Sequence, residues 1–186
     1  MKSNVLQIPN WLPSDAAQPE MSVAAWNLLS HTDSLTTHLR ELTHNSIRHC
    51  LLAANWGHPT AIERQALKLE NDERTWIRSI EWRRKNQLWV HARAVFPEST
   101  IKATGTKFPG LGIQSLGEII FKDPELKRDP FFFSLLGKDS VYYSIIPEII
   151  DATDTVWARR SILHYQDHPI LITEIFMPES YAQSNA

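Results

Sequence analysis

The stretch WARRSILHYQDHPILITEIFMP, residues 157–178, decides the fold of this chain. Two nine-residue runs rich in Ile, Leu, Thr and aromatic residues, 157–165 and 169–177, flank a polar break at residues 166–168. Because such a break between two such runs is typical of a β-hairpin, the sequence predicts two paired strands. The second run is apolar on both faces, which predicts a central strand that is covered on both sides.

One carboxylate interrupts that second run. Glu174 stands on the same side of the predicted strand as Ile172 and Phe176, because strand side chains alternate between the two faces. Burying a carboxylate there is costly unless it is paired with another group or binds one. Two interpretations stay open: a structural ion pair or a solvated edge on the one hand, and a ligand contact on the other.

A second hairpin is predicted over residues 75–82 and 88–96, with the polar break at residues 83–87 between them. In the first of these strands Arg78 alternates into the face that carries Trp76, Ile80 and Trp82. A guanidinium group is suited to a bidentate grip on a carboxylate. Arg78 is therefore predicted either to pair with Glu174 in the core or to bind a small organic anion in an enclosed pocket.

The composition is that of an ordinary globular domain. A chain of 186 residues, 42% hydrophobic and 22% charged, is long enough for one core that encloses a small ligand. The net charge of -2 gives no indication of nucleic-acid binding. The single cysteine, Cys50, excludes an internal disulfide and indicates a reducing compartment. We expect Cys50 to be buried, and we find no apolar run of signal-peptide or membrane-spanning length.

The remaining segments complete an α+β prediction with one domain. Residues 1–20 are predicted to form an extended arm, and residues 21–186 the folded domain. We expect about six antiparallel strands, with helices on one face and flap loops over an internal pocket. The predicted strands are 46–54, 75–82, 88–96, 131–136, 157–165 and 169–177, with a further strand or edge at 141–146. Helices are predicted within 21–30 and at 35–43, and residues 144–155 are left without a prediction.

Six short motifs stand in a fixed order along nearly the whole chain. They are Asp33-Ser34-Leu35-Thr36, Trp76-Ile77-Arg78, Val90-His91-Ala92-Arg93-Ala94-Val95-Phe96-Pro97, Leu111-Gly112 with Ser115-Leu116-Gly117, Arg159-Arg160-Ser161, and Thr173-Glu174-Ile175-Phe176-Met177-Pro178. In order and rough spacing this series resembles the chorismate–pyruvate lyase family, bacterial enzymes that make 4-hydroxybenzoate for ubiquinone. Each motif alone is weak, whereas all six in order are specific.

The resemblance implies a chorismate lyase, which forms 4-hydroxybenzoate and pyruvate with no metal or organic cofactor. It implies ring contacts from Leu35 and Leu116, and a carboxylate held by Arg78. Glu174 is implied to hydrogen-bond the ring hydroxyl group and to assist proton transfer, so Arg78 and Glu174 are the catalytic candidates. Because chorismate is a dianion, Arg93 is a candidate for the second carboxylate. We expect a cytoplasmic monomer with no nucleic-acid partner.

Two alternatives to catalysis stay open. A similar fold serves as the effector-sensing domain of some bacterial transcription regulators, and a degenerate lyase would bind 4-hydroxybenzoate without efficient turnover. The chain also departs from the family pattern: Ser115 stands where proline is usual, and Ser79 where glutamate often follows the arginine. None of the eight histidines forms an HExxH motif, and the sequence predicts no metal site.

Overall fold

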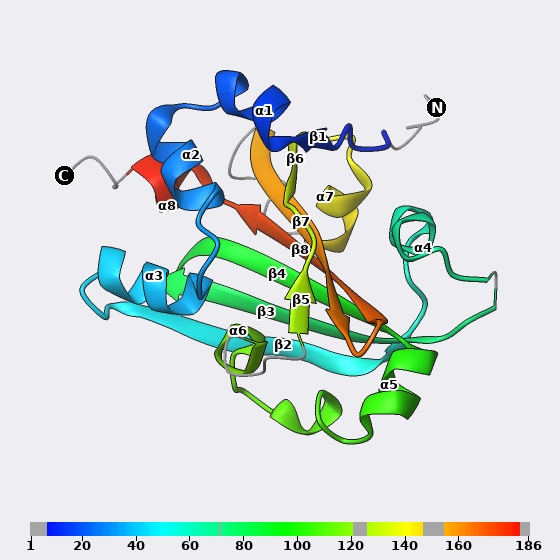
Figure 1. Cartoon of the computed structure of the whole chain (residues 1–186). Coiled ribbons are helices and arrows are strands. Elements are labelled where there is room, and N and C mark those ends of the chain that lie inside the picture. Colours follow the sequence, from blue (N-terminus) through cyan, green and yellow to red (C-terminus); the bar gives the residue numbers. More distant parts are fainter. Residues whose placement is uncertain (1–6, 71, 121–125, 147–154, 183–186) are drawn as a thin grey trace.

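One antiparallel sheet of eight strands organises the chain, in a computed structural model that describes residues 7–70, 72–120, 126–146 and 155–182. Its strands are β1 (Leu12–Pro13), β2 (Ile47–Gly57), β3 (Thr75–Arg84), β4 (Gln87–Pro97), β5 (Leu126–Arg128), β6 (Phe132–Gly137), β7 (Thr155–Tyr165) and β8 (His168–Phe176). Their order is β1-β6-β7-β8-β4-β3-β2, and β5 pairs with β7 (Figure 1). The six predicted strands are confirmed, and the short β1 and β5 add to them.

Short helices surround the sheet. They are α1 (Ser14–Ala17), α2 (Val23–Leu29), α3 (Leu35–Leu42), α4 (Ala61–Leu67), α5 (Glu98–Thr104), α6 (Leu116–Ile120), α7 (Val141–Ile145) and α8 (Pro178–Ala182). Ser34 caps α3 by accepting a hydrogen bond from the backbone N–H of Thr37, and Thr60 caps α4 in a capping box with Glu63. Among these described elements, no helix is long and apolar enough to cross a membrane.

Both predicted hairpins are confirmed. Gln166 and Asp167 join β7 to β8 at φ values of 47° and 67°, and Lys85 and Asn86 join β3 to β4 at 52° and 51°. Positive φ at both central residues is the geometry that matches the twist of paired strands in a tight hairpin. Strand β8 lies between β7 and β4, so the strand that is apolar on both faces is central, as predicted.

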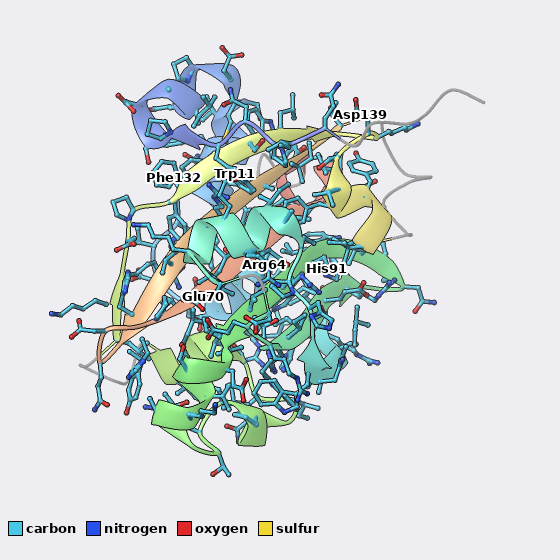
Figure 2. All side chains as sticks on the ribbon, turned by 90° about the vertical axis from the view of Figure 1, so that its right-hand side faces the viewer. Trp11, Arg64, Glu70, His91, Phe132 and Asp139 are labelled. Atoms are coloured by element: carbon cyan, nitrogen blue, oxygen red, sulfur yellow. The ribbon has the colours of Figure 1, made fainter. Side chains whose placement is uncertain are left out.

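Helices cover both faces of the sheet, whereas the sequence predicted one. The site face, which carries Arg78, Ile80 and Glu174, packs against α2 and α3, for example through Leu39. The other face, called the α4 face, packs against α4 and α7. Figure 2 looks onto α4, which crosses in front of the strands on this side. A central strand that is apolar on both faces needs cover on both, and this explains the difference.

Three local expectations were wrong. Residues 141–145 form helix α7 instead of a strand, because the Ser140 hydroxyl caps its first turn and Tyr142 packs into the core. Cys50 is exposed, because side chains alternate along the edge strand β2: Ile47 points inward and Cys50 points outward. Uninterrupted alternation over residues 88–96 predicts that Trp89 shares a face with Arg93, but a register shift after Trp82 turns Trp89 onto the site face.

The first described residues lie against the sheet. Leu12 and Pro13 pair with β6, Ala17 is fully buried, and the ring of Trp11 meets Tyr142 edge-on at a centroid distance of 6.2 Å. The predicted division of the chain at residue 20 stays a prediction. Most of the segment 144–155, to which no element was assigned, falls in 147–154, outside the described residues.

Candidate active site

A cavity of about 50 Å³ lies between the site face and the elements that cover it. Its floor comes from β3, β4 and β8, and its cover comes from the start of α3 and from residues 115–117, which end the segment 105–117 that we call the flap. Arg78 and Glu174 both line this cavity, as do Leu35 and Leu116. The structure therefore brings four of the five predicted site residues around one space.

Arg78 holds the flap against the sheet by hydrogen bonds to its backbone. Its side chain rises from β3 and is only 3% exposed, and its Nη2 donates to the carbonyl oxygens of Gly112 at 3.1 Å and Gln114 at 2.6 Å. Burial lowers the pKa of Arg78 from its usual value, because desolvation disfavours the charged form. A guanidinium is basic enough to remain a cation nonetheless. Among the described residues no carboxylate pairs with Arg78, so its charge is available to an anionic ligand.

Further contacts hold the flap against the sheet. His49 Nε2 lies 2.7 Å from the carbonyl oxygen of Ile113, and the hydroxyls of Thr36 and Ser115 are 2.9 Å apart. Gly112 has φ +53°, in the region where a side chain would be strained, and this conformation presents its carbonyl to Arg78. Ser115, which departs from the family pattern, thus gives the flap a hydrogen bond that proline lacks the hydroxyl to make.

Glu174 is anchored by an arginine other than Arg78. Its side chain rises from β8, 8% exposed, and Oε2 accepts from Arg159 Nε at 2.5 Å. Arg159 Nη1 also donates to the carbonyls of Leu29 at 2.7 Å and His31 at 2.6 Å. The interpretation in which Arg78 and Glu174 satisfy each other is therefore wrong. In the described structure, Oε1 of Glu174 accepts no hydrogen bond, so it can receive one from a ligand.

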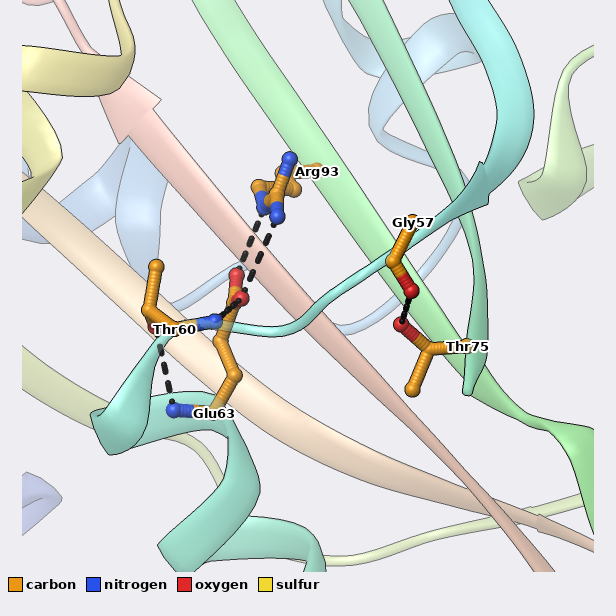
Figure 3. A network of polar contacts seen from close by, with 5 residues as sticks. All are labelled: Gly57, Thr60, Glu63, Thr75 and Arg93. Carbon is orange, nitrogen blue, oxygen red and sulfur yellow. Dashed lines mark hydrogen bonds and ion pairs between the residues drawn. The ribbon is translucent and has the colours of Figure 1, made fainter. Parts of the chain in front are cut away.

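Arg93 lies elsewhere. It points to the α4 face, where its Nε and Nη2 donate to the two carboxylate oxygens of Glu63 at 2.7 and 3.2 Å (Figure 3). Ala92 and Ala94, its neighbours in β4, line the cavity instead. This placement corrects the expectation that Arg93 binds the second carboxylate of the ligand, because strand alternation puts Arg93 and Arg78 on opposite faces of the sheet. The register, which pairs Arg93 with Ser79, already contains this signal.

Two arginines of the cavity were missed by the sequence reasoning. Arg159 has the same strand parity as Trp157 and stands opposite Glu174 in the hairpin register, a signal that the sequence contains. Arg128 lies on the three-residue strand β5, which carries too little periodicity for sequence reasoning to place. Both line the cavity. Three arginines and two carboxylates, Asp33 and Glu174, therefore line it, and the excess of one positive charge suits an anionic ligand.

A stacked histidine pair adjoins this site. The rings of His31 and His38 lie 4.0 Å apart at 16°, and the carbonyl of His31 is one of the acceptors for Arg159. Burial lowers the pKa of His38, and so do His31 and Arg159, against an opposing effect of Glu41. The unfolded chain therefore binds this proton more readily than the folded one. The corresponding stability is present above pH 6.5 and is lost as the pH falls through the folded-state pKa.

Replacement of His38 by glutamine is expected to flatten the acid side of the stability profile. The melting temperature of the wild-type protein should fall between about pH 7.5 and pH 5.5 more steeply than that of His38→Gln, since the variant has no proton to take up here. Differential scanning calorimetry at a series of pH values measures this slope. His58→Gln, at an exposed position, is the matched control. Identical slopes for wild type and His38→Gln would contradict the assignment.

Chemically, the arrangement is a lidded chamber with a cation and a carboxylate on its floor. The described residues contain no group of three or more His, Cys, Asp or Glu side chains placed to hold a metal ion. The available chemistry is anion binding by Arg78, hydrogen bonding or proton transfer by Glu174, and apolar contact from Leu35 and Leu116. Such a set can orient a small cyclic acid in a site with little water.

Known proteins match this chain over almost its entire length. A Coxiella burnetii protein described as a probable chorismate pyruvate-lyase is 34% identical over 175 residues, which are 91% of this chain and 94% of that protein. A chorismate pyruvate-lyase of Pectobacterium atrosepticum is 26% identical over 178 residues, 96% and 89% of the two chains.

Among solved structures, the effector-binding domain of the trehalose repressor of Bacillus subtilis is similar with a TM-score of 0.52 and 10% identity. The match covers 72% of this chain and 92% of that domain. At this identity the likeness concerns the fold alone. The sequence pattern of the chorismate lyase family matches residues 5–186. With that match and the relatives above, the chain belongs to the chorismate lyase family.

Proposed function

We propose that this protein is a chorismate lyase, which eliminates pyruvate from chorismate and leaves 4-hydroxybenzoate. One observation carries the proposal: Arg78 and Glu174 line the same small cavity beneath a flap, each with a group free to meet a ligand. The family membership supports the same activity. The product is an aromatic ring with a carboxylate at one end and a hydroxyl at the other, which matches one cation and one carboxylate.

Each end of the ring has a proposed partner. Arg78 binds the ring carboxylate, and Glu174 hydrogen-bonds the ring hydroxyl through Oε1. Leu35 and Leu116, each 6% exposed, supply apolar contact to the ring. Arg159 acts through Glu174: its ion pair offsets the cost of burying the carboxylate and fixes where Oε1 points. Arg93 has no part in this proposal, because it lies on the α4 face.

The chemistry needs little machinery. The bond between the ring and the enolpyruvyl oxygen breaks, and its electron pair leaves with that oxygen. The neighbouring carbon, which bears the hydroxyl group, loses a proton, and its C–H electrons form the double bond that completes the aromatic ring. The enolpyruvate takes up a proton and becomes pyruvate. We propose that orientation by Arg78, proton transfer by Glu174 and a dry site suffice, with no metal or organic cofactor.

Incubation of the purified protein with chorismate tests the proposal. Pyruvate should appear together with an aromatic ultraviolet spectrum, in equal amounts. In Glu174→Gln, kcat should fall by about 100-fold or more, which is the scale of a lost proton-transfer group. Glu70→Gln removes an exposed carboxylate and is the matched control. A Glu174→Gln protein with full activity would remove Glu174 from the mechanism.

Binding without turnover is the alternative outcome. The fold is similar to that of an effector-binding domain, so a protein that bound 4-hydroxybenzoate but released no pyruvate would be a binding module or a degenerate lyase. Calorimetric titration with 4-hydroxybenzoate, run beside the chorismate assay, distinguishes these cases. Release of pyruvate by the wild-type protein excludes the binding module, and efficient release over many turnovers excludes the degenerate lyase as well.

A further inference from the structure

Arg128 is a half-buried cation in the lining of the cavity, and the proposed mechanism assigns it no function. Its Nη1 donates to the Ser161 hydroxyl at 2.9 Å, and its guanidinium carbon lies 5.0 Å from the centroid of the Phe131 ring. In the part of the chain that the structure describes, no carboxylate forms an ion pair with it. Serine and an aromatic face can orient a guanidinium but leave its charge without a counter-ion.

Arg128 lies at the boundary between the internal cavity and a second pocket. Together with Asp33 it lines both the internal cavity and a neighbouring groove of about 640 Å³. The groove is bordered by Phe131, Phe133 and the loop before α3. A group bound to Arg128 would thus lie where the enclosed chamber meets the groove.

Ring contacts place Arg128 at the Glu174 end of the chamber, because the guanidinium carbons of Arg128 and of Arg159, the partner of Glu174, lie 5.0 and 4.3 Å from the centroid of the same Phe131 ring. Burial lowers the pKa of Arg128, the charge of Glu174 raises it, and the charge of Arg159 lowers it again. Arg128 is thus close enough to both members of the Glu174–Arg159 pair to be influenced by their charges. The guanidinium remains a cation.

The structure of chorismate requires a second anion site at this end. Its enolpyruvyl ether is attached to the ring carbon next to the one that carries the hydroxyl group, and it bears the second carboxylate. If Arg78 holds the ring carboxylate and Glu174 the hydroxyl, the second carboxylate must lie beside Glu174 and away from Arg78. Arg93 cannot reach it through the sheet, whereas Arg128 stands at that end of the cavity.

We propose that Arg128 binds the enolpyruvyl carboxylate, distinguishes the dianionic substrate from the monoanionic aromatic product, and directs the leaving pyruvate toward the neighbouring groove. This inference rests on the proposed function. It gives the arginines separate tasks: Arg78 binds a carboxylate that substrate and product share, and Arg128 binds one that only the substrate and the departing pyruvate possess. Binding by Arg128 also places negative charge next to a cation while the ring–oxygen bond breaks.

The test compares Arg128→Met and Arg128→Lys with the wild-type protein. Lys127→Met, at an exposed position one residue away on β5, is the matched control. Three quantities are compared. They are kcat/KM for chorismate, followed by pyruvate release, the Kd of 4-hydroxybenzoate by calorimetry and, for a protein that does not turn chorismate over, the Kd of chorismate with the same instrument. Melting temperatures establish that each variant is folded.

Arg128→Met should lower kcat/KM for chorismate by about 10- to 100-fold, the scale of one lost charge-assisted contact. Its Kd for 4-hydroxybenzoate should stay within about threefold of the wild-type value, because that ligand lacks the second carboxylate. Arg128→Lys should recover part of the loss, and Lys127→Met should show none. Unchanged kcat/KM in Arg128→Met, or an equal loss of 4-hydroxybenzoate affinity, would overturn the inference.

Failure of the proposed function can be distinguished from failure of the inference about Arg128. If the wild-type protein released no pyruvate, the lyase assignment would be wrong, and the Kd of chorismate in wild type and Arg128→Met would still decide the role of Arg128. A wild-type protein that bound 4-hydroxybenzoate but not chorismate would overturn both. Should Arg128→Met not fold, the change in kcat/KM for chorismate, set against the change in the Kd of 4-hydroxybenzoate, supplies the same comparison in Arg128→Lys.

Discussion

Replacement of Arg78 by methionine is expected to reduce pyruvate release from chorismate by at least about a hundredfold. The substitution removes the cation that we assign to the ring carboxylate, and it leaves that carboxylate buried without a partner. It also leaves the carbonyls of Gly112 and Gln114 without their donor, which should loosen the flap over the cavity. Because substrate and product share the ring carboxylate, affinity for 4-hydroxybenzoate should fall as well.

Steady-state kinetics and calorimetric titration measure the two effects of Arg78→Met. Arg48→Met is the matched control, because Arg48 is exposed on the neighbouring strand β2. The circular dichroism spectrum should remain that of the wild-type protein, since the methionine fills most of the volume of the arginine stem. An Arg78→Met protein that binds and converts chorismate normally would refute the role of Arg78, and with it the carboxylate-binding end of the site.

Replacement of Glu63 by alanine is expected to lower the free energy of unfolding by about 3–5 kcal/mol, because it leaves the largely buried cation of Arg93 uncompensated. The Glu63 side chain is fully buried and that of Arg93 is 12% exposed, so little water can compensate the loss. Glu63 also accepts from the Thr60 backbone N–H at the start of α4, and this cap would be lost as well. Urea denaturation measures the change.

Two further variants separate these contributions. Glu63→Gln keeps a side chain that can complete the capping box but removes the charge, so its loss of stability should be smaller than that of Glu63→Ala. The double variant Glu63→Leu with Arg93→Leu should recover most of the stability, because an apolar pair of similar size often replaces a buried ion pair without cost.

Chorismate turnover by the folded double variant is the decisive observation for Arg93. It should be retained, because the pair lies on the α4 face, away from the cavity. Loss of chorismate binding in a folded protein would return Arg93 to the candidate ligands.

Much of the site could be predicted because strand alternation is a property of a few consecutive residues. Arg78 and Glu174 were assigned to apolar faces from their immediate neighbours, and the structure places both on the site face. The same rule, applied across the register of β3 and β4, would have moved Arg93 to the opposite face. Where the alternation is interrupted, as in the register shift beside Trp89, the same rule assigns the wrong face, because a bulge adds a residue without a sequence signal.

Secondary structure was predicted less well where tertiary packing overrides local preference. Residues 141–145 contain two tyrosines, a valine and an isoleucine, which favour a strand in isolation. They form α7 because the helix buries Tyr142 and Tyr143 against residues of β6 and β7. In contrast, the paired turns of both hairpins were predictable, since their polar residues break two strongly apolar runs.

The sequence by itself determined the two hairpins, the central position of β8, and a cation and a carboxylate on apolar strand faces. Only the tertiary structure decided which groups those charges meet. Glu174 pairs with Arg159, and Arg159 in turn binds the carbonyl of Leu29, 130 residues away. The physical reason is that alternation is fixed by backbone geometry within a strand, whereas ion pairs and flap contacts depend on how distant segments pack.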